Sequence, residues 1–578
     1  MNAKQRLIAI ARGDEPADLL LTNARVINVF SGEVIPDCAI AISGAHVAGV
    51  GDYADGKEIL DLGGAHVAPG LIDAHMHMES SMVPPPEFAR LAVPHGTTHV
   101  VIDPHEIANV LGVEGVRYML RAAKGLPLSI HVMVPSCVPA THMETAGAVL
   151  GVEEIQSLLA EEGVLGLAEM MNFPGVIHGV PEVLAKVDAG LAGSRVDGHA
   201  PGLTGKALQA YVSAGISTDH ESSTRNEALE KLRAGMMVLI REGSAAKNLE
   251  TLLPLVTDGN KHRFCFCTDD RHPGDVLREG HIDHVVRKAI SLGLSPVAAI
   301  QIATLFPANH FGLRDAGAIA PGRRADLIVL DDLHSFEIRQ VYQGGRLVAE
   351  GGKYLFDTAA TVPEQTANTV HLPEGFSEDS FAIPADPVPE RIRVIGMQRH
   401  QLTTDELIEA PCVEEGRLVV DLDRDLLKLA VIERHRGTGN IGLAFIHGFG
   451  LKRGALASTV GHDSHNLTVL GTNDRDMYVA AKALGESRGG QAVACDGKVL
   501  ALMPLPIAGL MSDQPAEVLV TQQQALLDAY RTLGSPVEDP FMTLSFMPLA
   551  VIPKLKLTDM GLVDVEKFEL VPLAADAE

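Results

Sequence analysis

Residues 66–77 read HVAPGLIDAHMH, a short apolar run that ends in two histidines separated by one residue. Further apolar or β-rich segments follow at intervals of about 30 residues, and each ends in polar residues and precedes a plausible helix. They are THVVIDPHE (98–106), LSIHVMVPS (128–136), VLGLAEMM (164–171), SRVDGHAPG (194–202), GISTDHESS (215–223), MMVLIREGS (236–244) and RFCFCTDD (263–270). Eight βα units within about 250 residues match the size of a (β/α)8 barrel. We therefore predict an α/β protein whose residues 68–315 form a TIM barrel; an open doubly wound sheet is the alternative.

The segments on either side of the predicted barrel have a different sequence pattern. Short β-runs broken by turns occupy residues 18–67 and return in residues 317–348, which predicts one small β-sandwich domain built from residues 1–67 and 316–356. Residues 357–390 lack helical or strand periodicity and are rich in Pro, Thr and acidic residues, which indicates a linker. Residues 391–578 contain both strand-like and helix-like runs, so we predict a C-terminal α+β domain.

The length, charge and cysteine content of the chain exclude some classes of protein. At 578 residues the chain is too long for one hydrophobic core. The 74 acidic and 47 basic side chains give a net charge of -27, which repels phosphate backbones and anionic membranes, so neither nucleic acid nor a membrane is an expected partner. Six scattered cysteines and the lack of an apolar leader predict a reduced, cytoplasmic protein. We expect a homodimer or a higher homo-oligomer.

The ends of the predicted strands are rich in metal-ligand types. Alternate residues of a strand face the same side, so His75 and His77 can reach one ion. An H-x-H alone is weak evidence, because histidine on a strand is more often a hydrogen-bonded core residue. Four further strand ends supply ligand types, however: Glu169, His199, His220 and Asp269. Six ligands exceed a single zinc site and suffice for two divalent transition-metal ions with one bridging carboxylate. Imidazole and carboxylate without thiolate suit Mn or Fe(II), and Zn also fits.

Other polar residues lie at or just beyond the strand ends. Side chains there can hydrogen-bond a substrate, with plain salt bridging as the alternative; they are Glu79, Asp103, His105, Glu106, Arg241 and Glu242. Asp270 should point away from its neighbour Asp269, which favours a structural role. In the C-terminal domain His462, Asp463 and His465 form a dense polar cluster that could cap the barrel mouth or bind another metal, or be a solvated turn.

The pattern resembles the amidohydrolase superfamily: an H-x-H on the first strand, histidines on the fifth and sixth, and an Asp after the eighth. Glu169 on the fourth strand, where many members carry a carboxylated lysine, resembles the adenine deaminase branch and also N-acetylglucosamine-6-phosphate deacetylases. Longer stretches favour the bacterial adenine deaminases, and they reach from the barrel into the C-terminal domain: HMHMESSM, DPHEIANV, LAEMMNFPGVI, DGHAPGL, REGSAAKN, CTDDRHPG, GHIDH, ATLFPANHFGL, GHDSHN and LPIAGLMS.

The resemblance implies hydrolysis of a small purine, adenine, to hypoxanthine and ammonia by a hydroxide on a binuclear metal site. It also implies that Glu169 bridges the metals and that Asp269 moves the proton. The alternatives are another amidohydrolase reaction, such as deacetylation of an amino sugar or opening of a cyclic amide, and a non-catalytic scaffold. A phosphorylated sugar needs a basic pocket, whereas Arg241 is the one clear basic residue at these strand ends, so the sequence favours a neutral heterocycle.

Overall fold

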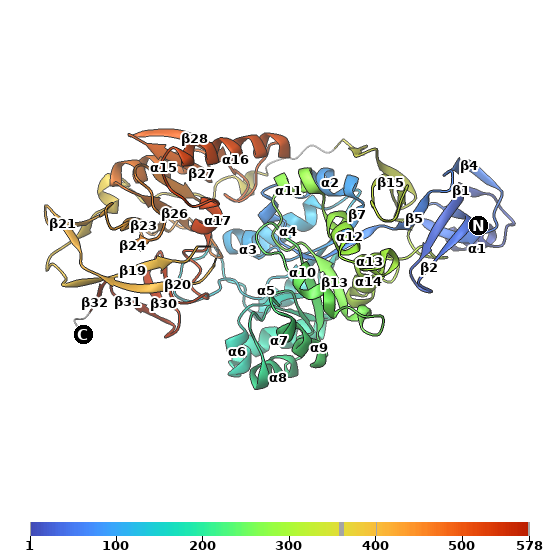
Figure 1. Cartoon of the computed structure of the whole chain (residues 1–578), viewed down its shortest axis with the longest axis horizontal. Helices are drawn as coiled ribbons and strands as arrows, with labels where there is room; N and C mark the ends of the chain where they lie inside the picture. Colours follow the sequence, from blue (N-terminus) through green and yellow to red (C-terminus); the bar gives the residue numbers. More distant parts are fainter. Residues whose placement is uncertain (1, 358–362, 400, 576–578) are drawn as a thin grey trace.

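The computed structural model describes residues 2–357, 363–399 and 401–575. The barrel lies in the middle of an elongated molecule, between an N-terminal sheet and the C-terminal domain (Figure 1). The fold class predicted from the sequence is confirmed, whereas the proposed domain boundaries stay a prediction.

The N-terminal sheet is assembled from both sides of the barrel sequence, in the order β17-β16-β15-β14-β5-β1-β2-β3 with β4 paired to β1. Its strands are β1 (Ala17–Asn28), β2 (Glu33–Ser43), β3 (His46–Gly51), β4 (Gly56–Asp61), β5 (His66–Pro69), β14 (Leu327–Leu330), β15 (Ile338–Gln343), β16 (Arg346–Glu350) and β17 (Lys353–Tyr354). Antiparallel pairing of β5 with β14 joins the two flanks. Helix α1 (Ala3–Ala11) packs Ile10 against one face of this sheet, against Leu20 and Ala41.

The barrel has eight strands at the eight positions that the sequence indicated. They are β6 (Leu71–Met76), β7 (Thr97–Ile102), β8 (Ser129–Val134), β9 (Val164–Met170), β10 (Val196–Gly198), β11 (Thr218–Asp219), β12 (Met237–Arg241) and β13 (Phe264–Cys267). The strands form a five-stranded and a three-stranded parallel group, β10 to β6 and β11 to β13. Hydrogen bonds from Asp269 N to His75 O (3.0 Å) and from Ser217 N to Val196 O (3.3 Å) link the two groups into a barrel.

Helices connect the barrel strands and pack around them. The longer ones are α2 (Pro85–Ala92), α4 (Val113–Ala122), α5 (Val152–Leu159), α7 (Pro181–Gly193), α8 (Gly205–Ser213), α9 (Arg225–Arg233), α12 (Ile282–Ser291) and α13 (Pro296–Ala303), with the shorter α3 (His105–Leu111), α6 (Phe173–Ile177), α10 (Leu249–Leu252), α11 (Pro273–Glu279) and α14 (Leu305–Phe311). Side chains from alternate strand positions fill the interior, including Ile72, Val101, Met133 and Leu239. Cys265 and Cys267 belong to the same cluster, as expected for two positions on one face of a strand.

The C-terminal domain is a mixed sheet, in the order β20-β19-β24-β23-β26-β25-β27-β28 with β32 paired to β19. Its strands are β19 (Arg391–Met397), β20 (Thr404–Glu409), β23 (Leu427–Ile432), β24 (Ile441–His447), β25 (Ala455–Ser458), β26 (Leu467–Gly471), β27 (Gly490–Cys495), β28 (Lys498–Pro504) and β32 (Ala574–Ala575). Helices α15 (Asp474–Glu486), α16 (Ala516–Arg531) and α17 (Pro540–Ser545) lie with it, and two small three-stranded sheets complete the domain: β18 (Ile383–Pro384), β21 (Cys412–Glu414) and β22 (Arg417–Val419), and β29 (Leu555–Thr558), β30 (Gly561–Asp564) and β31 (Glu569–Val571).

Part of the segment predicted as a linker packs against this domain. Phe381 is fully buried, β18 pairs with β22, and Arg434 donates to the carbonyl of Thr369 at 2.9 Å. Residues 358–362 of the predicted linker lie outside the described residues. Within the part of the chain that the structure describes, no helix is long and apolar enough to cross a bilayer.

Candidate metal centre and active site

The six predicted ligands meet at the carboxyl ends of the barrel strands: His75, His77, Glu169, His199, His220 and Asp269. One oxygen of Glu169 lies 3.4 Å from His77 Nε2, and the other lies 2.7 Å from His199 Nδ1 and 3.1 Å from His220 Nε2. Asp269 Oδ1 lies 3.1 Å from His77 Nε2 and 3.5 Å from His75 Nε2. Glu169 therefore joins His77, directly after β6, to His199 and His220, which follow β10 and β11.

The backbone departs from regular strand geometry where it presents these groups. The pairing of β6 with β7 shifts register between Asp73 and Met76, so the alternation that places Ile72 and Ala74 inside the barrel does not continue to the histidines. Asp269 adopts a left-handed φ of 57°, which aspartate tolerates better than most residues. Such strain is typical of functional positions that the surrounding structure fixes.

Glycine at position 198 permits the close approach of β10 and β11. A Cβ there would lie 2.3 Å from the carbonyl oxygen of Thr218, so no larger residue fits without moving a strand. The Gly198 N–H donates to Thr218 Oγ1 at 2.9 Å. This close contact fixes the backbone directly before His199 and two residues before His220.

Two residues that the sequence assigned to substrate, Asp103 and His105, lie against the ligand set. The ligand atoms of His77, Asp103, His105 and Glu169 all lie within 4.8 Å of one another. His105 Nδ1 is 3.4 Å from Asp103 Oδ2 and 3.7 Å from Glu169 Oε1. Burial disfavours protonation of His105, but the close contact with Asp103 and the charge of Asp463 together outweigh burial and raise the pKa of His105 to about 10. These two residues are thus placed either to contact a substrate or to extend the ligand set.

The donor set fits divalent transition-metal ions. Several buried ligand atoms have no hydrogen-bond partner among the described residues, namely His75 Nε2, His105 Nδ1 and both carboxylate oxygens of Asp103. Buried polar atoms without partners are rare in folded proteins, and a bound cation would satisfy them. Imidazole and carboxylate donors suit Mn, Fe(II) or Zn.

Arg241, another predicted substrate contact, makes ion pairs with Asp269 and Glu221. Burial disfavours ionisation of Asp269, but the charge of Arg241 together with the contacts of His75, His77 and His220 outweighs burial and holds the pKa of Asp269 well below its usual range. Glu221 was missed by the sequence reasoning, although its Oε1 lies only 3.4 Å from His220 Nε2. Its position directly after a ligand histidine at a strand end was the available signal.

Ser80 and Asp270 lie beside the predicted ligands and extend the polar cluster. Asp270 was expected to be structural, yet its carboxylate shares a possible metal group with His77 and Asp269. Ser80 Oγ lies 2.5 Å from Asp270 Oδ1 and 3.0 Å from Glu106 Oε1. Burial, reinforced by the negative charge of Glu79, raises the pKa of Glu106 to about 8, so the Glu106 carboxyl is protonated at neutral pH.

The last two predicted substrate contacts, Glu79 and Glu242, differ in where their carboxylates point. Glu79 is buried, accepts from the Ile107 N–H at 3.0 Å with one oxygen, and leaves its other oxygen without a partner among the described residues. Glu242 instead faces away from the ligand cluster, where it pairs with Lys288 Nζ at 2.8 Å and accepts from the Leu249 N–H at 3.3 Å.

The polar loop of the C-terminal domain covers this end of the barrel. Asp463 Oδ1 lies 3.9 Å from His105 Nε2, and His465 Nε2 lies 3.9 Å from Glu106 Oε2. His462 stacks on Phe546 with ring centroids 4.6 Å apart. None of the possible metal groups formed by the described residues includes a residue of this loop. The position of this loop favours a cover over the barrel mouth and does not favour a further metal site.

Comparison with known proteins agrees with this geometry. The amidohydrolase family model matches residues 66–348, which span the barrel, and defines this part of the chain as an amidohydrolase. The model of the adenine deaminase C-terminal domain matches residues 401–569. A solved beta-aspartyl dipeptidase from Fervidobacterium islandicum AW-1 is 20% identical, with a TM-score of 0.46, 59% of this chain covered and 99% of that chain, a likeness too low to bear on function.

Full-length relatives identify the particular family. The chain is 51% identical over 569 residues to an adenine deaminase of Desulfatibacillum aliphaticivorans, covering 98% of this chain and 99% of the relative. An adenine deaminase of Methanothrix thermoacetophila is 50% identical over 569 residues, with 98% and 99% covered. The chain belongs to the adenine deaminase family.

Proposed function

We propose that this protein hydrolyses adenine to hypoxanthine and ammonia at a binuclear metal site. The observation that carries the proposal is the meeting of six ligand side chains, Glu169 among them, at one end of the barrel in a chain whose relatives, named adenine deaminases, match 98% of it. His75, His77 and Asp269 would hold one divalent ion, His199 and His220 the other, and Glu169 would bridge them. Two such ions, when bound, lower the pKa of a water molecule towards neutrality.

The chain's own side chains can move the protons that the reaction requires. Attack of water on C6 of adenine forms a tetrahedral centre, which expels ammonia once the ring and the amine have gained protons. Asp269, kept ionised by Arg241 and the neighbouring histidines, can accept the first proton of the attacking water and pass it to the ring, and can then carry the second, from the new hydroxyl group, to the departing amine. Glu106, protonated at neutral pH, can donate a hydrogen bond to a ring nitrogen.

The decisive experiment offers adenine to Mn-loaded protein. Ammonia release together with a shift of the ultraviolet spectrum to that of hypoxanthine is expected. Adenosine should react poorly, because the loop around Asp463 covers the cluster closely. Inert adenine combined with turnover of a cyclic amide or an N-acetyl sugar phosphate would contradict the proposal, and full-length protein that binds no transition metal would favour a non-catalytic scaffold.

The proposal also covers the cellular location and the binding partners of the enzyme. We infer a cytoplasmic protein that contacts neither nucleic acid nor membrane, supported by the net charge of -27. Assembly into a homodimer or a higher homo-oligomer stays a prediction, which size-exclusion chromatography with light scattering would test.

A further inference from the structure

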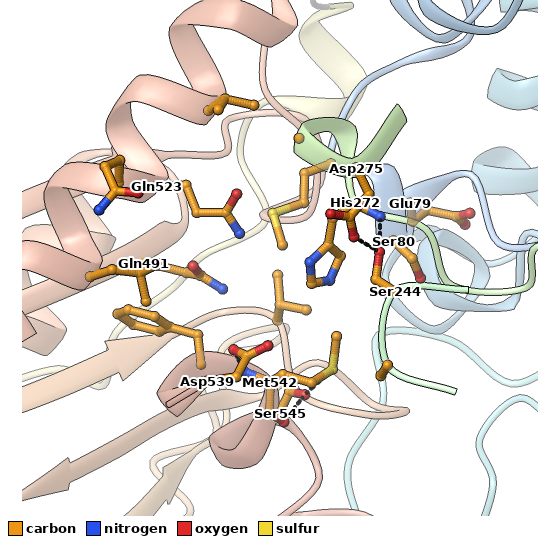
Figure 2. Close-up of a pocket in the computed structure, with 18 of the residues that line it drawn as sticks. Glu79, Ser80, Ser244, His272, Asp275, Gln491, Gln523, Asp539, Met542 and Ser545 are labelled. Carbon is orange, nitrogen blue, oxygen red and sulfur yellow. Dashed lines mark hydrogen bonds between the residues drawn. The ribbon is translucent and has the colours of Figure 1, made fainter. Parts of the chain in front are cut away.

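A cavity of about 320 Å³ lies between the barrel mouth and the C-terminal domain. The barrel side includes Ser80, Glu106 and His272, and the opposite side includes Gln491 of β27 and Gln523 of α16. Figure 2 shows Gln491 and Gln523 reaching from the C-terminal domain towards His272. The volume is in the range of small-molecule sites, which begins at roughly 300 Å³.

Three polar groups that line this cavity make no hydrogen bond to another described residue, and one of them, His272 Nε2, is fully buried. Neither the Gln491 carboxamide nor the Gln523 carboxamide finds a hydrogen-bond partner in the described part of the chain, although Gln491 as a residue is only 3% exposed. His272 Nε2 is buried and likewise lacks a partner among the described residues. By contrast, Gln524 on the same helix is engaged, because its carboxamide donates to Asp528 Oδ1 at 2.9 Å. Unpaired polar groups around a cavity of this size are typical of a ligand site.

The cavity borders the catalytic cluster. Ser80 lines it and contacts Asp270 Oδ1 at 2.5 Å, and Asp270 shares a possible metal group with His77 and Asp269. A molecule in the cavity is therefore separated from the ligand cluster by one layer of side chains. This arrangement suits a waiting position for the substrate more than a remote regulatory site.

We propose that this cavity is a vestibule that binds adenine before it reaches the metal site, with Gln491 and Gln523 as specificity-determining residues. The inference rests on the proposed function and adds a second recognition site, supplied by the C-terminal domain. A carboxamide offers one acceptor and one donor group side by side, which pair with the N6 amino group and N7 of adenine.

The same chemistry separates substrate from product. Hypoxanthine carries O6 in place of the amino group, so its corresponding edge presents two acceptors. The carboxamide oxygen that accepts from adenine then faces another acceptor and loses its hydrogen bond. The vestibule accordingly binds adenine more tightly than hypoxanthine and favours release of the product.

The test replaces each carboxamide with an apolar group of similar size, in Gln491→Leu and Gln523→Leu. Each variant of the Mn-loaded full chain should raise KM for adenine by about 3- to 10-fold, the equivalent of one lost hydrogen bond, while kcat stays near the wild-type value. The control is Gln514→Leu, since Gln514 is exposed, does not line the cavity and bonds to Asp513. This variant should behave as wild type.

Binding measurements separate recognition from a purely structural effect. Equilibrium dialysis of the metal-depleted full chain, which cannot turn the ligand over, with radiolabelled adenine and hypoxanthine should show that wild type prefers adenine and that both cavity variants lose the preference at unchanged melting temperature. Equal binding preference and unchanged KM in both folded variants would overturn the inference and leave the proposed function standing. If wild type binds adenine through these glutamines but releases no ammonia, the proposed function fails and the binding site stands.

Discussion

Replacing Glu169 by Gln removes one negative charge at the centre of the ligand cluster and preserves the size of the side chain. Its two oxygens lie 3.4 Å from His77, 2.7 Å from His199 and 3.1 Å from His220, so the substitution affects both predicted metal positions at once. Breaking a buried charged contact of this kind costs about 3–5 kcal/mol. Because 1.36 kcal/mol is a factor of ten, metal affinity and turnover should fall by about two to four orders of magnitude.

Metal content measured by mass spectrometry after dialysis, together with ammonia release from adenine, checks this expectation. The matched control is Glu242→Gln, a second buried glutamate at a strand end whose carboxylate pairs with Lys288 Nζ at 2.8 Å, outside the cluster. The control should retain metal and turnover, which also tests the sequence prediction that Glu242 contacts substrate. Full metal content and wild-type turnover in Glu169→Gln would refute the bridging assignment.

Three further predictions concern the other charged groups. His75→Ala and His77→Ala should each lower metal content and turnover together, and retention of both by both variants would remove these residues from the site. Asp269→Asn should keep most of the metal yet lose about 10²- to 10⁴-fold in kcat, measured by ammonia release, because proton transfer is lost. Burial lowers the pKa of Lys556 to about 7, so its stability penalty is complete below pH 7 and diminishes as pH rises towards the unfolded value near 10.5. Lys556→Met also removes the donor to Leu402 O and Phe546 O, so the pH dependence is the test: the free energy of unfolding of the variant relative to wild type should fall by about 2–3 kcal/mol between pH 7 and pH 9, and parallel pH profiles would contradict this.

The barrel could be predicted from the sequence, and candidate ligands could be proposed, because both follow the regular spacing of the strands. Eight apolar segments at regular spacing indicated eight strands, and ligand types at their ends indicated a site, because all carboxyl ends of a parallel barrel meet on one face. His75 and Asp269 are 194 positions apart in the chain, yet the barrel closes by a hydrogen bond between their backbones. Strand order alone implied that contact.

Residues beyond the regular strands were harder to assign, since their direction depends on local backbone geometry. Strict alternation after β13 would turn Asp270 away from Asp269, but the left-handed φ of Asp269 breaks the alternation and both carboxylates face His77. Glu242 shows the reverse case: its place at a strand end suggested a role at the mouth, whereas its carboxylate pairs with Lys288 of α12. A change in backbone direction at a single residue decides whether such a side chain faces the ligand cluster. The pattern of apolar residues in the sequence does not reveal this change.

The cavity beside the cluster depends on contacts that no local pattern encodes. Gln491 and Gln523 come from a strand and a helix more than 200 residues after His272, and each reads locally as an ordinary polar residue of its element. They line the cavity only because the C-terminal domain packs against the barrel. Hydrogen bonds from Ala516 N to Glu87 Oε1 at 2.7 Å and from Asn466 Nδ2 to Thr145 O at 2.9 Å hold the two parts together. The barrel carries the candidate metal ligands, whereas one wall of the adjoining cavity is supplied by the docked C-terminal domain.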